Sequence, residues 1–177
     1  FIVEKGFPGL SFGKKEKKLG IRASSTTEVV LDECQVPKAN VLAREGMGFI
    51  ATMRTFDYTR PGVAAQALGI AEGAFEYALN YAHTRKQFDK PISSFQAVSH
   101  MLADMATSIE ACRTLIYTTA RMIDEGGGKN LSKVSSMCKV LASDVAMKVT
   151  TDAVQLLGGY GAMKDYPVAQ MFRDAKI

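Results

Sequence analysis

The sequence predicts a mainly α-helical protein, an up-down four-helix bundle that follows the last strands of a β domain. Three features predict this fold class. Three long segments carry apolar residues at the three- and four-residue spacing of amphipathic helices. The connections between these segments are short, which favours antiparallel neighbours. The beginning of the chain, by contrast, is rich in β-branched residues and turn residues.

Residues 1–42 are predicted to be the C-terminal part of a β domain. The segments FIVEK (1–5) and PGLSFG (8–13) are candidates for short extended pieces, and TTEVVLDECQVP (26–37) has the strongest strand pattern. Two or three strands alone do not make a stable sheet, so we expect a larger sheet than these residues can form.

Residues 43–177 are predicted to be the helical bundle, truncated in its last helix. A short helix is expected over 47–56. A longer helix is expected to begin near Pro61, with Asp57 or Thr59 as its N-cap, and to end near Arg85. Apolar and small residues surround this helix almost completely, which predicts a central, buried position.

Two further long helices follow, and then the start of a fourth. Ser94 is the expected N-cap of the first, which ends at the glycines 126–128. The second ends at Gly158, because glycine enters the left-handed region without steric cost. Pro167 opens the last helix. One glycine is enough for the helix end at GGYG (158–161), so the other glycines predict a backbone that something approaches closely.

Composition argues against several classes of protein. The net charge is +4, and its surplus lies in KKEKK (14–18), a solvated cluster without the interleaved aromatic residues typical of nucleic-acid binding. No apolar run reaches the roughly 18 residues of a membrane span, and no targeting segment is visible. The three cysteines lie far apart, so we expect reduced, buried thiols in a cytoplasmic (bacterial) or mitochondrial-matrix protein. His83 and His100 are isolated and show no metal-ligand spacing.

Three stretches are candidates for function, and each also has a simpler structural explanation. GGYG could be only a helix C-cap. Arg85, in HTRKQF, could neutralise the carbonyl end of a helix, although its guanidinium also suits a phosphate. Asp57 and Arg60, in FDYTRP, could cap a helix and form a local ion pair. The residue types alone indicate a helical bundle with a candidate anion site.

Taken together, the motifs resemble the acyl-CoA dehydrogenase family, in particular its medium- and short-chain branch, and the resemblance covers essentially the whole chain. The segments that carry it are KLGIRAS, EVVLDECQVPKANVL, FDYTRPGVAAQALGIAEGAFEYALNYAHTRKQF, SSFQAVSHMLADM and DAVQLLGGYGAMKDYPVAQMFRDAKI. The resemblance implies the end of a middle β domain followed by most of a C-terminal four-helix bundle.

The resemblance also implies an FAD site between the two domains, with the adenosine-pyrophosphate end of FAD reaching across a dimer contact. The residues that match flavin contacts are Arg85, Lys86, Gln87, Phe88, Phe95, Gln96, Gln155, Leu156, Leu157, Gly158 and Gly159. Those that match the acyl-CoA channel are Asp57, Tyr58, Thr59 and Arg60. On this interpretation the glycines admit the cofactor of a neighbouring subunit, and Arg85 neutralises phosphate charge.

The implied reaction is the dehydrogenation step of fatty-acid β-oxidation. A glutamate removes the α-proton of an acyl-CoA, the β-hydride passes to the flavin, and a trans-2-enoyl-CoA forms. No residue of this chain matches the base. Thr59 occupies the position that carries it in some branches and cannot serve, so we expect the glutamate just after Ile177 and no activity from these residues alone. Asp89 stands where the family commonly has glycine and adds negative charge near the phosphate contact.

The resemblance further implies an electron-transfer flavoprotein as electron acceptor and a homotetramer built as a dimer of dimers. No nucleic-acid partner and no membrane insertion are expected. Two alternatives remain open. One is an acyl-CoA oxidase, in which oxygen reoxidises the flavin. The other is a non-catalytic, oligomeric family member that binds flavin or CoA without turnover.

Overall fold

The computed structural model describes residues 1–177 and divides into two compact units, Phe1–Phe56 and Asp57–Ile177. The division falls inside the first long helix, α1 (Gly48–Thr84). The predicted boundary between a β domain and a helical domain, after residue 42, stays a prediction.

The first unit contains one antiparallel pair of strands, β1 (Leu10–Phe12) and β2 (Val29–Leu31), followed by the short 3₁₀ helix η1 (Lys38–Asn40). Leu10 lies opposite Leu31 in this register. All three residues of β2 are exposed, with Val29 and Leu31 each at 58%. The strand expected over residues 1–5 is absent, because its backbone has a single inter-segment bond, from the Ile2 N–H to the Asn40 carbonyl, and no ladder.

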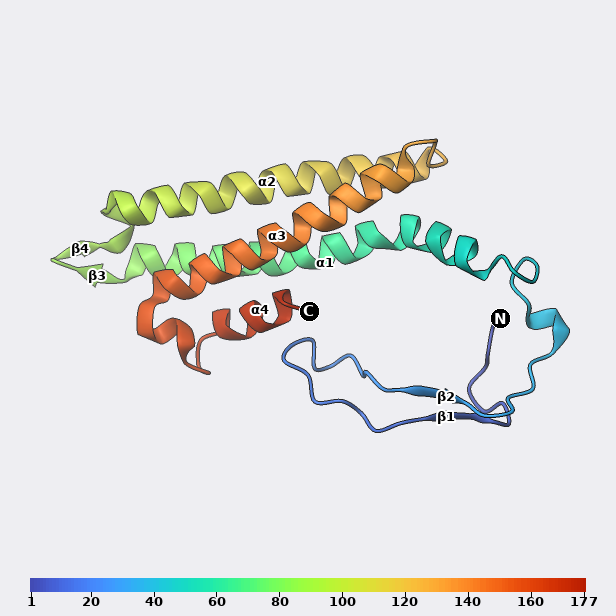
Figure 1. Cartoon of the computed structure of the whole chain (residues 1–177). Helices are drawn as coiled ribbons and strands as arrows, with labels where there is room; N and C mark the ends of the chain where they lie inside the picture. Colours follow the sequence, from blue (N-terminus) through green and yellow to red (C-terminus); the bar gives the residue numbers. More distant parts are fainter. The chain divides into compact units, whose positions relative to one another are not determined.

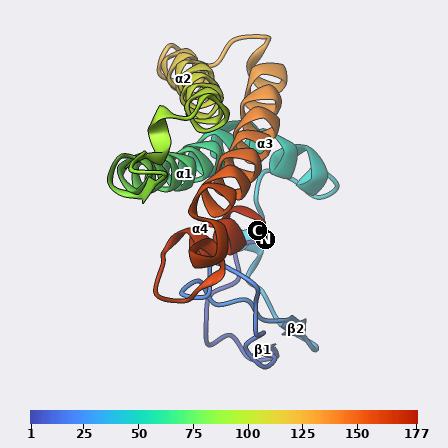
Figure 2. The ribbon, with the colours of Figure 1, turned by 90° about the vertical axis from the view of Figure 1, so that its left-hand side faces the viewer.

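The helices run up and down in sequence order, as predicted (Figure 1). After α1 comes a hairpin of two short strands, then α2, α3 and a short α4 that packs back against α3 (Figure 2). The remaining elements are β3 (Lys86–Gln87), β4 (Lys90–Pro91), the 3₁₀ helix η2 (Ile92–Ser94), α2 (Gln96–Asp124), α3 (Leu131–Leu157), the 3₁₀ helix η3 (Gly158–Ala162) and α4 (Val168–Ala175).

The core pairs small residues on α1 with larger ones on its neighbours. The α1 residues buried in it are Ala64, Leu68, Ala71, Ala74, Ala78 and Ala82. Those of α2 are Leu102, Met105, Ile109, Cys112 and Ile116, at alternating three- and four-residue spacing. Each fully buried side chain of that size stabilises the fold by about 1.5–3 kcal/mol relative to exposure. The stripe on α1 corrects the expectation that this helix is buried all round, since Val63 on its other face is 53% exposed.

The predicted break before Pro61 is wrong, because α1 continues through this proline as one helix of 37 residues. Asp57 and Thr59 therefore lie inside the helix and cap nothing. Proline removes one helical N–H donor, but its fixed φ suits the helix, and its ring is buried here. The preceding residue, Arg60, is held by hydrogen bonds to Asp57 and, on α3, to Ser136.

The helix ends were predicted better than the starts. The Gly127 N–H donates to the Met122 carbonyl and the Gly126 N–H to that of Ile123, which is the Schellman pattern that closes α2. Gly158 ends α3 with a φ of +59°, as expected. Ser94, however, does not cap α2. Its hydroxyl donates to the carbonyl of Pro91, the last residue of β4, and Phe95 takes the N-cap position.

Cys112 and Cys138 are buried free thiols, and burial raises the pKa of both. Cys34 is half-buried and also free. No helix of this structure combines the length and the hydropathy that crossing a bilayer requires.

Candidate functional site

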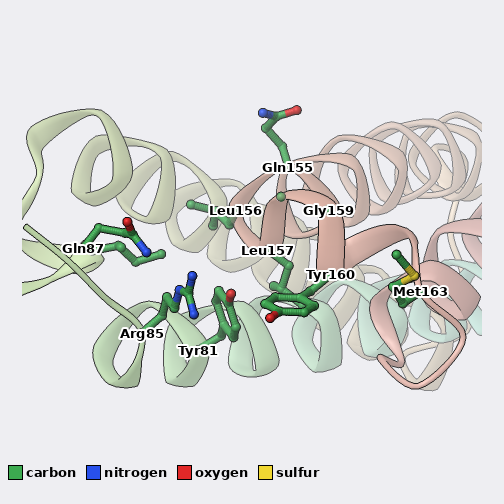
Figure 3. A pocket seen from close by; sticks show the side chains of 11 residues that line it. Tyr81, Arg85, Gln87, Gln155, Leu156, Leu157, Gly159, Tyr160 and Met163 are labelled. Carbon is green, nitrogen blue, oxygen red and sulfur yellow. The ribbon is translucent and has the colours of Figure 1, made fainter.

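A groove of about 470 Å³ lies where the end of α1, the β3–β4 hairpin and the α3–η3 junction meet (Figure 3). Its lining residues are Tyr81, Arg85, Gln87, Ile92, Gln155, Leu156, Leu157, Gly158, Gly159, Tyr160 and Met163. We call it the Arg85 groove. It brings together residues about 70 positions apart in the chain, Arg85 and Gln87 on one side and Gln155 to Gly159 on the other.

Arg85 is the cation that lines this groove, and its backbone is fixed on both sides. Its N–H donates to the Tyr81 carbonyl at the end of α1, at 2.8 Å, and its carbonyl accepts from the Ile92 N–H at 2.9 Å. The guanidinium lies 5.8 Å from the centre of the Tyr160 ring. No carboxylate forms an ion pair with Arg85. Its positive charge is therefore not neutralised within the chain, which is what an anion site needs.

The glycines of GGYG serve different purposes. Gly158 supplies the positive φ that ends α3. A side chain at Gly161 would place its Cβ 2.3 Å from the Val154 carbonyl oxygen, so this close approach is to the protein's own helix. A Cβ at Gly159, in contrast, would have no atom within 4 Å. Gly158 and Gly159 both line the groove with open space around the backbone, and of these two only Gly158 has a positive φ.

Four of the residues expected to contact flavin do not line the groove. Lys86 and Phe88 belong to the hairpin, whose two turn residues, Phe88 and Asp89, have φ values of +51° and +62°. This is the backbone of a tight hairpin turn, which favours glycine, asparagine or aspartate. Asp89 is thus compatible with its position. Phe88 is 86% exposed and contacts Phe95 edge to face, with centroids 6.2 Å apart. Gln96 is exposed in the first turn of α2.

The residues expected to line an acyl-CoA channel lie on α1, far from the Arg85 groove along the helix. Arg60 pairs with Asp57 at 3.3 Å and also donates to the Ser136 hydroxyl at 3.2 Å. The local ion pair predicted from FDYTRP is confirmed. Tyr58 and Thr59 are exposed on the same helix.

A second groove, of about 380 Å³, lies between α1 and α2, and we call it the Arg113 groove. Its lining residues are Ala65, Leu68, Gly69, Glu72, Arg113, Ile116, Tyr117 and Ala120. Arg113 donates through Nε and Nη2 to Glu72 and through Nη1 to Glu110. Hydrogen bonding to Glu72 is the largest cause of the raised pKa of Arg113. Burial opposes this rise, and the charges of Glu72 and Glu110 add to it. No group of histidine, cysteine and acidic side chains in the structure is suited to hold a metal ion.

Sequence reasoning missed Tyr81, Ile92, Tyr160 and Met163, which also line the Arg85 groove. Two of them could have been found. Tyr160 is the third residue of GGYG itself, and Tyr81 precedes Arg85 by four residues, which places both on one face of a helix end.

A family model described as the acyl-CoA dehydrogenase C-terminal domain matches residues 46–177. The chain belongs to the acyl-CoA dehydrogenase family. This family consists of FAD-dependent oxidoreductases, and the match confirms the resemblance drawn from the motifs.

Among relatives of this acyl-CoA dehydrogenase chain, the cyclohexane-1-carbonyl-CoA dehydrogenase of Geobacter metallireducens is 52% identical over 177 residues, which are 100% of this chain and 46% of that protein. The solved butyryl-CoA dehydrogenase of Megasphaera elsdenii is 51% identical with a TM-score of 0.96, over 99% of this chain and 45% of that one. A chain in a structure of the electron transferring flavoprotein of Acidaminococcus fermentans is 54% identical with a TM-score of 0.96, and the match covers 100% of this chain and 46% of that one. The chain thus spans about half the length of the relatives it matches.

Proposed function

We propose that this chain is the C-terminal helical portion of a flavin-dependent acyl-CoA dehydrogenase, preceded by strands of its middle β domain. The enzyme forms a trans-2-enoyl-CoA, with electrons passing to an electron-transfer flavoprotein. One observation carries the proposal. The Arg85 groove gathers Arg85, Gln87 and the segment from Gln155 to Gly159 around one space, and both groups match flavin contacts of the family.

The residues present fit the pyrophosphate end of FAD. Arg85 offers an unpaired positive charge on a backbone that is hydrogen-bonded on both sides, and arginine hydrogen bonds to phosphate in a fork geometry. Gln87 and Gln155 add amide donors, and Gly159 leaves its backbone open. When bound, FAD supplies the hydride acceptor of the reaction. The groove residues bind and orient its phosphates, and on this proposal they serve the cofactor of a neighbouring subunit.

For the acyl-CoA substrate we propose the segment from Asp57 to Arg60. The pairing with Asp57 and Ser136 fixes the Arg60 side chain on α1. None of residues 1–177 is assigned as the base. Thr59 has no ionisable group in the relevant pH range, and Glu72 is bound to Arg113. We place the glutamate that removes the α-proton just after Ile177.

The relatives support the reaction class and leave the acyl group open, because proteins of nearly equal identity are named for a cyclic and a linear acyl-CoA. The likeness to a chain in an electron transferring flavoprotein structure supports that flavoprotein as electron acceptor. A cytoplasmic or matrix location and assembly as a dimer of dimers belong to the same proposal.

The test is anaerobic mixing of the complete, FAD-loaded gene product with linear, branched and cyclic acyl-CoAs while the flavin absorbance is followed. Bleaching with one class is expected and would name the substrate. A Tyr117→Leu variant is the matched control. It should bleach at a similar rate, because Tyr117 is exposed on α2 and lies outside both proposed binding segments. Absence of bleaching with every acyl-CoA, in protein that holds FAD, would exclude the dehydrogenase and favour the non-catalytic alternative.

An acyl-CoA oxidase is the second candidate, because a prolyl acyl carrier protein oxidase has the same fold with a TM-score of 0.92, at 29% identity. Oxygen consumption during turnover separates the two functions. The dehydrogenase should reduce an electron-transfer flavoprotein and consume little oxygen.

A further inference from the structure

Two tyrosines continue the line of side chains that begins at Arg85. The Tyr160 ring, under the guanidinium, stacks on the Tyr166 ring with centroids 5.2 Å apart and planes 29° from parallel. Tyr160 lies in η3 and Tyr166 lies just before α4. Figure 3 shows the Tyr160 ring beside Tyr81 and Arg85 at the groove. The Arg85 guanidinium therefore lies against the Tyr160 ring, which lies against the Tyr166 ring.

The second ring is anchored while the first is not. Tyr166 packs against the core, as do Tyr77 and Tyr81 of α1. Loss of water around that hydroxyl raises the pKa of Tyr166, followed by smaller effects of Tyr160, Tyr81, Tyr77 and Asp165. Tyr160 is 45% exposed, so the stack on Tyr166 provides its support. Tyr166 therefore connects the core to Tyr160, and Tyr160 in turn contacts Arg85.

We propose that Tyr160, backed by Tyr166, is a positioning residue that holds the Arg85 guanidinium ready for the diphosphate of a dinucleotide. This inference rests on the proposed function, in which Arg85 binds the phosphates of FAD. An arginine side chain has many rotamers, and ordering it opposes binding. A carboxylate partner would order it but would also neutralise it. A ring face orders the guanidinium through cation–π attraction and leaves its hydrogen-bond donors for the phosphate.

The experiment is a double-mutant cycle on FAD affinity in the complete gene product. The variants are Tyr160→Leu, Arg85→Gln and both together. Each deflavinated variant is titrated with FAD while flavin fluorescence is followed, and thermal melts confirm that each is folded. Tyr160→Leu is expected to weaken FAD binding roughly two- to tenfold. In the Arg85→Gln background the same change should have almost no further effect, because a residue that acts through Arg85 has nothing left to position.

Two further variants make the readout specific. Tyr160→Phe keeps the ring and should restore FAD affinity to within about twofold of the parent. Tyr117→Leu, an exposed tyrosine on α2 outside the groove, should leave FAD affinity unchanged. A structural role for the Tyr160 side chain would instead produce the same loss with or without Arg85.

The outcomes separate the two proposals. If Arg85→Gln weakens FAD binding but Tyr160→Leu adds its full loss in the double variant, the positioning role is wrong and the FAD site stands. If Tyr160→Phe binds as weakly as Tyr160→Leu, the hydroxyl and not the ring matters, and the positioning role is again wrong. If Arg85→Gln leaves FAD affinity unchanged, the assignment of the groove to FAD fails, and this inference fails with it.

Discussion

The Arg85 groove and the Arg113 groove are similar in size, about 470 and 380 Å³, and each contains one arginine. The two grooves differ in the side chains that face the arginine. Arg113 donates to Glu72 and Glu110, so its donors are used and two negative charges surround one positive charge. Arg85 faces the ring of Tyr160 and forms no ion pair. An arginine in a groove is thus evidence for an anion site only when the chain leaves its charge unpaired.

The sharpest test of this difference replaces each arginine by glutamine. Arg85→Gln should weaken FAD binding roughly 10- to 100-fold, the range for losing a hydrogen bond to a charged group. Arg113→Gln should leave FAD affinity unchanged and lower the melting temperature slightly, mostly at low salt. Equal losses of FAD affinity in the two variants would show that only net charge matters and that the grooves are not distinct.

Alanine substitutions of one glycine in each groove test the same difference without removing a charge. A Cβ at Gly159 or at Gly69 has no atom within 4 Å in the structure, and neither residue needs a positive φ. Gly159→Ala should reduce FAD affinity by roughly tenfold, since an added methyl group meets the bound ligand, with stability unchanged. Gly69→Ala, within α1, should raise the free energy of unfolding by about 0.5–1 kcal/mol and leave FAD affinity alone. Urea unfolding and FAD titration measure both. Unchanged FAD affinity in Gly159→Ala would remove Gly159 from the site.

Which residues form these grooves could be predicted only in part. The resemblance to a family found Arg85, Gln87 and the segment from Gln155 to Gly159. A local rule found Gly126 and Gly158, because a helix end of this kind needs a residue that adopts a positive φ. Pro61 and Ser94 were misassigned as helix-start signals. Tertiary contacts stabilise α1 through the proline, and the serine hydroxyl has a nearer acceptor in Pro91. Tyr160 was missed because its contact with Arg85, from a distant part of the sequence, exists only in the folded chain.

Tyr166 supports the Arg85 groove through Tyr160, and its contribution to the stability of the fold should depend on pH. Loss of water raises the pKa of Tyr166 above its ordinary value of 10.0, so the folded protein favours the neutral phenol. This contribution to stability is fully present below about pH 10 and is lost as the pH rises through the raised pKa. The free energy of unfolding, measured by urea across this pH range, should therefore fall less steeply with pH in Tyr166→Phe than in the parent. The same slope in both proteins would contradict the desolvation of this hydroxyl.

The smallest effect is expected at the tip of the β3–β4 hairpin. Asp89 adopts a φ of +62°, which glycine adopts without strain. Asp89→Gly should therefore stabilise the protein by about 0.5 kcal/mol, as measured by urea unfolding. Removing this carboxylate should raise FAD affinity by less than about twofold, because Asp89 does not pair with Arg85. A tenfold rise would mean that Arg85 is partly neutralised after all, and the contrast between the two grooves would weaken.

The continuity of α1 has a consequence for how copies of this protein could complement one another. Because the helix runs unbroken from Gly48 to Thr84, Arg60 and Arg85 lie roughly 40 Å apart along its axis. One small group bound at Arg60 cannot also touch Arg85 of the same copy. If the two arginines belong to the active sites of different subunits, a mixed assembly of Arg60-defective and Arg85-defective chains would contain some sites with both arginines intact and some with neither. Activity recovered on mixing two inactive variants would then be a genetic signature of a site shared between subunits.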